Sequence, residues 1–140
     1  TGVQTCALPI YLEKEVVPYC QSENVALIPY FPLAGGFLTG KYQKGKPAPT
    51  GSRGESSEYV QKYMTDKNFA ILDQLIAFAK DHGHEMNELA IAWLLAQPQV
   101  ASVISGATRL DHIQQNATAS EWELSSNELE EIERILKSER

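Results

Sequence analysis

Apolar residues recur along much of this chain at the three- and four-residue spacing that places side chains on one face of a helix. Residues 66–81 have this pattern clearly, and Gly83 follows them as a helix stop signal. Four more segments are predicted to be helical: residues 12–23, 86–96, 109–119 and 125–137. Pro18 is expected to kink the first of these helices or to begin its regular part, and Ser125 with Glu128 forms a capping-box pattern at the start of the last.

Two other segments are apolar without that spacing. Residues 25–30 and residues 100–104 are short, continuous apolar runs, which is typical of parallel strands covered on both faces. Pro32 has no N–H to donate to a sheet, so the first strand is predicted to end before it. Strands that alternate with helices in this way predict an α/β fold.

Each predicted strand is followed by a loop with features of an anion site. After the first come Gly35, Gly36 and Lys41, where missing side chains let backbone N–H groups approach a ligand and a cation stands nearby. Alone, this stretch favours an ordinary glycine-rich turn over a binding site. After the second strand come Gly106 and Arg109, again just before a helix. Two such units in one chain favour a binding site over two unrelated turns.

Residues 43–65 are polar and rich in glycine and proline, and they are predicted to form a long loop. Loops of this length in compact folds tend to be functional lids. Arg53 within it is either a solvated charge or a ligand contact.

Charge and hydropathy exclude several classes of partner and location. The net charge of −6 and the absence of a basic stripe argue against a nucleic-acid or anionic-membrane partner. No apolar run approaches the roughly 18 residues of a membrane span, and the first ten residues do not resemble a secretory signal. Cys20 is expected to be a packed apolar residue, and His82 and His84 to be surface residues without a metal. A cytoplasmic protein is the expectation.

Four motifs in order give this sequence its resemblance to a known family. Residues 30–42 read Tyr-x-Pro-Leu-x-x-Gly-x-Leu-x-Gly-Lys-Tyr, and Gly-Ser-Arg follows at residues 51–53. Leu-Ala-x-Ala-Trp lies at residues 89–93, and Gly-Ala-Thr-Arg begins at Gly106, with Gln115 and Asn116 beyond it. In these motifs residues 11–140 resemble the aldo-keto reductases, in particular the branch with bacterial stress-type reductases and potassium-channel beta subunits.

The resemblance implies a fold and a cofactor. The fold is the C-terminal fragment of a (β/α)8 TIM barrel, with the last two strands and their helices, since a whole barrel takes about 250 residues. The implied cofactor is NADP(H), with the nicotinamide stacked on Tyr30 and the 2′-phosphate held by Thr108 and Arg109. The residues implied to bind the pyrophosphate or the adenosine end are Phe31, Pro32, Leu33, Ala34, Gly35, Lys41, Arg53, Gly106, His112, Gln115 and Asn116. Phe31 and His112 depart from the polar residue and the glutamine usual at these positions.

The resemblance also limits the chemistry. The Asp, Tyr, Lys and His of the family's catalytic tetrad lie in its earlier barrel segments, and no residue here matches them. The expected function is therefore the cofactor-binding part of an NADPH-dependent reductase of aldehydes or ketones, without activity when alone. The alternatives are an NADP-binding regulatory subunit of the channel-beta type and a truncated product without function. The carbonyl substrate and the oligomeric state stay open.

Residues 1–10 match none of these motifs. Read back into codons, they resemble a sequencing-library adapter, and they are expected to be non-native, with a disordered native terminus as the alternative.

Overall fold

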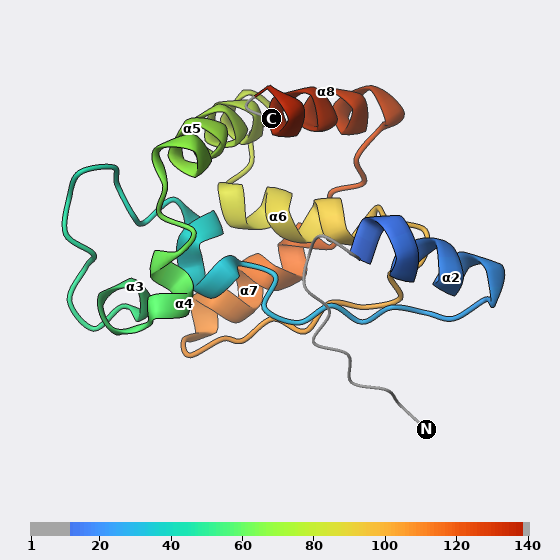
Figure 1. Ribbon diagram of the computed structural model, residues 1–140, viewed down its shortest axis with the longest axis horizontal. Helices are drawn as coiled ribbons and strands as arrows, with labels where there is room; N and C mark the ends of the chain where they lie inside the picture. The colour runs from blue at the N-terminus through green and yellow to red at the C-terminus, as the bar shows by residue number, and fades with distance from the viewer. Residues whose placement is uncertain (1–11, 139–140) are drawn as a thin grey trace.

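The computed structural model describes residues 12–138, so the predicted non-native segment lies outside the described residues. Over these residues the chain is mainly helical (Figure 1). Its elements are η1 (Leu12–Val16), α2 (Val17–Ser22), η2 (Ala34–Thr39), α3 (Arg53–Ser56), α4 (Glu58–Gln61), α5 (Asp66–Asp81), α6 (Met86–Leu95), α7 (Leu110–Ala119) and α8 (Ser126–Lys137). All five helices predicted from the sequence are present.

The helices begin where their sequences supply the right end groups. Pro18 lies in the first turn of α2, directly after the π-helical turn η1, so the regular helix begins around it, as the sequence predicted. The predicted capping box of α8 is present: the Ser125 hydroxyl accepts from the Glu128 N–H, and the Glu128 carboxylate accepts from the Ser125 N–H at 2.7 Å. The start of α5 is capped by the Thr65 hydroxyl, which accepts from the Asn68 N–H at 3.2 Å.

The apolar faces of α5, α6 and α8 meet in the core, with α5 and α8 lying side by side (Figure 1). Leu72 of α5, Leu89 of α6 and Ile132 of α8 are each only 2% exposed. Burying a side chain of this size stabilises a fold by about 1.5–3 kcal/mol. Cys20 of α2 is also buried, as predicted for a packed apolar residue.

One predicted surface residue is also packed on one side. The imidazole of His84 stacks on Trp122 with ring centroids 3.9 Å apart, and its Nδ1 lies 2.9 Å from the Glu88 carboxylate. His84 thus lies at the surface, partly exposed, with one ring face covered by the tryptophan, a contact that spacing along the chain does not reveal. His82 is exposed, as predicted.

The two predicted strands run parallel but form no regular strand among residues 12–138. They are joined by two isolated bridges, Leu27 to Val100 and Tyr30 to Ile104. Leu27 and Tyr30 are three residues apart, whereas their partners Val100 and Ile104 are four residues apart. The pairing register therefore shifts by one residue between the two bridges. This slip prevents a continuous ladder, and the strand prediction holds only for direction and pairing.

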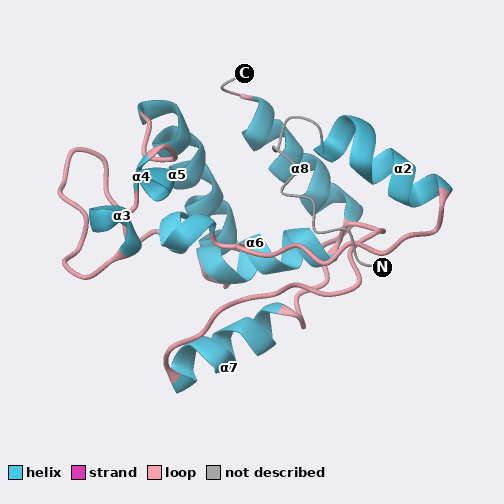
Figure 2. Cartoon of the chain, turned by 60° about the horizontal axis from the view of Figure 1, so that its bottom comes forward, coloured by secondary structure: helices cyan, strands magenta, loops and turns pink. Residues whose placement is uncertain are grey.

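The prediction that both strands are buried on two faces was wrong. Val25 is 47% exposed, Ile28 56% and Ile104 59%. Apolar strands are covered when neighbouring strands and helices lie on both sides of them. Here the two segments run past α6 and α7 and pair only with each other in the described part of the chain (Figure 2).

Candidate functional site

The two predicted ligand loops leave the paired segments at the same end. The second bridge joins Tyr30 to Ile104, and the Ile104 N–H donates to the Pro29 carbonyl at 2.9 Å. Because the segments are parallel, the chain beyond Tyr30 and the chain beyond Ile104 begin next to each other. In α/β folds, ligands bind beyond the carboxyl ends of parallel strands. The pairing therefore supports one site built from both loops.

The first loop is a tightly wound backbone. Phe31 and Ala34 have positive φ angles of 65° and 46°, and Gly35 and Gly36 continue in this region at 68° and 95°. Left-handed backbone is costly for residues with a Cβ and concentrates at functional sites. A Cβ on Gly35 would overlap the Val60 side chain, so glycine is required there for space as well as for conformation.

The loop uses some of its own N–H groups. The Ala34 N–H donates to the Phe31 carbonyl at 3.1 Å, and the Gly36 N–H donates to the Leu33 carbonyl at 2.8 Å. These two donors are thus occupied in this structure. The sequence predicted a loop whose backbone donors point to a ligand; at Ala34 and Gly36 the donors instead close the η2 turns.

Aromatic and cationic side chains surround this loop. Lys41 lies beside Gly36 and 5.1 Å from the centroid of the Tyr42 ring. The Arg53 guanidinium lies 5.9 Å from the centroid of the Phe31 ring, and that ring is 5.6 Å from Tyr59. Phe31 therefore holds Arg53 near the loop through its ring face, a contact that the sequence did not predict.

The predicted long loop is partly helical. Residues 43–65 contain α3 and α4, two four-residue helices that are too short to show a periodic pattern. They bring Arg53 back to the glycine loop, where the Gly54 N–H donates to the Tyr42 hydroxyl at 2.9 Å. Residues 43–52, in contrast, form the irregular loop at the left of Figure 1.

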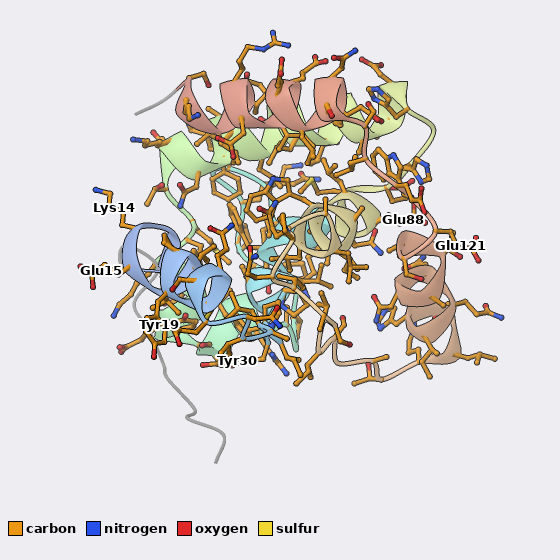
Figure 3. The ribbon with its side chains drawn as sticks, turned by 90° about the vertical axis from the view of Figure 1, so that its right-hand side faces the viewer. Lys14, Glu15, Tyr19, Tyr30, Glu88 and Glu121 are labelled. Carbon is orange, nitrogen blue, oxygen red and sulfur yellow. The ribbon has the colours of Figure 1, made fainter. Side chains whose placement is uncertain are left out.

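Tyr30, at the end of the first segment, is 63% exposed and lies at the lower edge of the molecule in Figure 3. It lies close to Tyr63, whose hydroxyl donates to the Tyr59 hydroxyl at 3.0 Å. Burial, followed by the bond to Tyr59, raises the pKa of Tyr63 to about 12. Exposed Tyr30 thus sits at the border of a tyrosine group that contains Tyr59 and Tyr63.

In the second loop, Gly106, Thr108 and Arg109 are exposed. Arg109 is the N-cap residue of α7, and its guanidinium donates two hydrogen bonds to the Asp111 carboxylate, one of them from Nε at 2.9 Å. Bonding to Arg109 lowers the pKa of Asp111 to about 2, and Asp111 in turn raises the pKa of Arg109. The residue expected to bind a phosphate therefore binds a carboxylate in this structure, a pairing that was not predicted from the sequence.

The remaining predicted contacts lie along α7. Asn116 lines a cavity of about 320 Å³ between α6, residues 102–107 and α7, together with Ser105 and Ile113. Gln115 accepts a hydrogen bond from the Asn87 amide at 3.4 Å, and His112 is half-buried next to Asp111. These residues share one helix, as predicted, although Asn116 faces the cavity.

Within residues 12–138 no three histidine, cysteine or acidic side chains come together in a group able to hold a metal ion. The helices of that range are all too short or too polar to cross a membrane.

Comparison with known proteins was made by family, by sequence and by structure. The sequence profile described as "Aldo/keto reductase family" matches residues 4–137. The chain is 34% identical to "Probable aldo-keto reductase 1" of Glycine max over 86% of its own length and 35% of the relative. It is 35% identical to "Probable voltage-gated potassium channel subunit beta" of Arabidopsis thaliana over 91% of its length and 40% of the relative. It is 33% identical to L-glyceraldehyde 3-phosphate reductase of Escherichia coli K12 over 81% of its length and 34% of the relative.

The fold agrees with these matches. The solved structure of a glycerol dehydrogenase from Gluconobacter oxydans superposes with a TM-score of 0.75 and 25% identity, covering 91% of this chain and 39% of that one. The chain thus spans between a third and two fifths of the proteins it matches. The profile match includes residues 4–10, part of the segment expected to be non-native, and the origin of that segment stays a prediction.

Proposed function

Because the chain belongs to the aldo/keto reductase family, we propose that it is the cofactor-binding part of an NADPH-dependent oxidoreductase that reduces aldehydes or ketones to alcohols. The observation that carries this proposal is the pairing of Tyr30 with Ile104, which starts both predicted cofactor loops at one edge. The (β/α)8 barrel, the NADP(H) cofactor and a cytoplasmic location belong to the same proposal.

The residues at this edge suit a dinucleotide. Lys41, Arg53 and Arg109 are exposed cations in a chain of net charge −6, and two of them flank the glycine loop. Cations around a glycine loop favour phosphate groups as the ligand.

In this proposal each loop has its own task. Lys41, Arg53 and the backbone of residues 31–35 bind the pyrophosphate, and Tyr30 orients the nicotinamide by stacking. Thr108 and Arg109 bind the 2′-phosphate, and His112, Gln115 and Asn116 contact the adenine end. NADPH, when bound, supplies the hydride. The chain contributes position, because none of its residues matches the family's proton-donating tetrad.

Two other functions are each supported by one observation. The similarity to a protein named as a potassium channel subunit beta favours an NADP-binding regulatory subunit. The exposed apolar residues of the paired segments favour a truncated product that does not fold stably. No nucleic-acid or membrane partner is proposed, and a small carbonyl compound is the proposed substrate of the whole enzyme.

The deciding experiment is a fluorescence titration of the purified chain with NADPH and with NADH. We expect saturable binding that is tighter for NADPH, because Arg109 suits a phosphate better than a ribose diol. With a generic aldehyde the chain should not oxidise NADPH. Absence of NADPH binding contradicts the cofactor role, and turnover contradicts the assignment of the catalytic groups to another part of the enzyme.

A further inference from the structure

The side chain of Tyr42 connects the glycine loop to the turn that carries Arg53. Tyr42 is 4% exposed, and its hydroxyl accepts a hydrogen bond from the Gly54 N–H at 2.9 Å. The same hydroxyl lies 3.3 Å from the Gly35 carbonyl and donates to it. One oxygen thus joins two backbone segments that are far apart in sequence, and it uses its donor and an acceptor position in doing so.

The backbone around this hydroxyl is closely packed. A Cβ on Gly54 would lie 2.6 Å from Cε1 of the Tyr42 ring, so only glycine brings the N–H this close to the hydroxyl. On its other side, the Gly54 carbonyl accepts from the Gln61 side-chain amide at 3.0 Å. Gly54 is therefore held through both its N–H and its carbonyl, and its position depends on Tyr42 and on α4.

Arg53 precedes Gly54 directly, so whatever fixes Gly54 also fixes the start of the Arg53 side chain. At the other end, the guanidinium lies near the ring of Phe31, a member of the glycine loop. The Tyr42 hydroxyl and the Phe31 ring thus make two connections between the same two segments. Without the hydroxyl, the Arg53 turn keeps its bonds to α4, such as the one from Gln61, but its link to the glycine loop is reduced to the exposed ring contact.

We propose that Tyr42 is a positioning residue that locks the glycine loop and the Arg53 turn into one unit, so that their donors reach the cofactor's phosphates together. This inference rests on the proposed function for its ligand, although the lock itself is independent of any ligand. A preformed unit needs less ordering when the ligand binds, which favours affinity. The Gly-Lys-Tyr motif then includes Tyr42 for its hydroxyl as well as for its buried ring.

The test is the variant Tyr42→Phe, which keeps the buried ring and removes the hydroxyl. We expect faster hydrogen exchange in the peptide containing residues 53–57, because the Gly54 N–H loses its partner. We also expect NADPH affinity to fall about fivefold, the ratio that one hydrogen bond of ordinary strength represents. Tyr19→Phe is the matched control, because Tyr19 is 64% exposed on α2 and should change neither measurement.

A double-mutant cycle with Arg53→Ala separates positioning from general stability. If Tyr42 acts through Arg53, Tyr42→Phe should have a much smaller effect on NADPH affinity once Arg53 is absent. An equal effect in both backgrounds, or unchanged exchange of residues 53–57, overturns the proposal. A wild-type chain that does not bind NADPH overturns the proposed function instead, and the exchange measurement then decides separately whether Tyr42 locks the two segments.

Discussion

Ala34 has a backbone conformation that is unfavourable for a residue with a Cβ. It has a φ of 46°, a region that costs a residue with a Cβ about 1–2 kcal/mol relative to right-handed backbone. Glycine has no such cost. We therefore expect Ala34→Gly to raise the free energy of unfolding by about 1 kcal/mol, less the small entropy loss of an added glycine.

Urea denaturation followed by circular dichroism measures this change. Ala101→Gly is the control, because Ala101 is exposed and its φ is not positive, so glycine there should lower stability slightly. If Ala34→Gly lowers the urea midpoint as well, the strained backbone assigned to the glycine loop is incorrect.

If Arg109 binds the 2′-phosphate as proposed, Asp111 competes with that phosphate for the guanidinium. Its carboxylate accepts two hydrogen bonds from Arg109 and, with a pKa lowered to about 2, stays ionised in moderately acidic solution. Asp111→Asn removes the competing charge, so we expect NADP⁺ to bind about threefold more tightly, as suits an exposed ion pair. Because the folded-state pKa is depressed, the competition is present above the ordinary pKa of 3.8 and is lost as the pH falls towards 2.

Calorimetric titration at pH 5 and pH 7 tests this expectation. The ratio of wild-type to variant affinity should be the same at both pH values, since both lie above the transition, and it should shrink at high salt. Glu121→Gln serves as the control for loss of one negative charge, because Glu121 follows the C-terminal end of α7 and Arg109 caps its N-terminal end. A variant that binds NADP⁺ more weakly than the wild type would mean that Asp111 orients Arg109 for the ligand.

At the scale of the elements, the capping box of α8 gives a direct prediction. Ser125→Ala removes the hydroxyl that accepts from the Glu128 N–H, and we expect a loss of about 1 kcal/mol in the free energy of unfolding. Ser126→Ala, one position later and without a capping bond, should have little effect. Equal losses in the two variants would contradict the capping role.

The same element carries a pH dependence. Hydrogen bonds from Ser125 lower the pKa of Glu128 below its ordinary 4.5. A depressed folded-state pKa contributes stability above the unfolded value and loses it as the pH falls, so the wild type should lose this contribution under acid. In Ser125→Ala the loss on acidification should be smaller, which urea midpoints at pH 3 and pH 7 will show.

The elements also show why the sequence predicted some features and missed others. Helices α5 and α8 were predictable because their apolar faces and end signals are encoded within the elements themselves. The bridge from Tyr30 to Ile104 and the slip in register beside it depend on residues far apart in sequence, so the ladder and its burial were mispredicted. The two loops of the candidate site were predicted from local motifs, and their cofactor role stays a prediction. The contacts of Tyr42, Tyr59 and Asp111 were missed, because each depends on where the fold places a partner.

At the scale of the whole molecule, the described residues combine a well-packed helical core with poorly covered extended segments. Apolar side chains of α5, α6 and α8 form the buried core, whereas Val25, Ile28 and Ile104 are about half exposed. Apolar extended segments that lack neighbours tend to pair with other chains. The candidate site lies at the end of these segments. Contacts that cover the segments are therefore expected to order the site loops as well.

The exposed apolar side chains of the extended segments predict that the chain associates through these segments in solution. We expect Ile28→Lys to reduce concentration-dependent association, because a charge on an exposed strand blocks pairing with another chain. Leu110→Lys is the matched control: Leu110 is 70% exposed but lies on α7, so a charge there should reduce association less. Sedimentation velocity over a range of concentrations measures the difference. If both variants become equally monomeric, association is driven by exposed apolar surface in general and not by the extended segments. If neither variant changes association, the contact between the two segments protects them sufficiently, and the prediction is wrong.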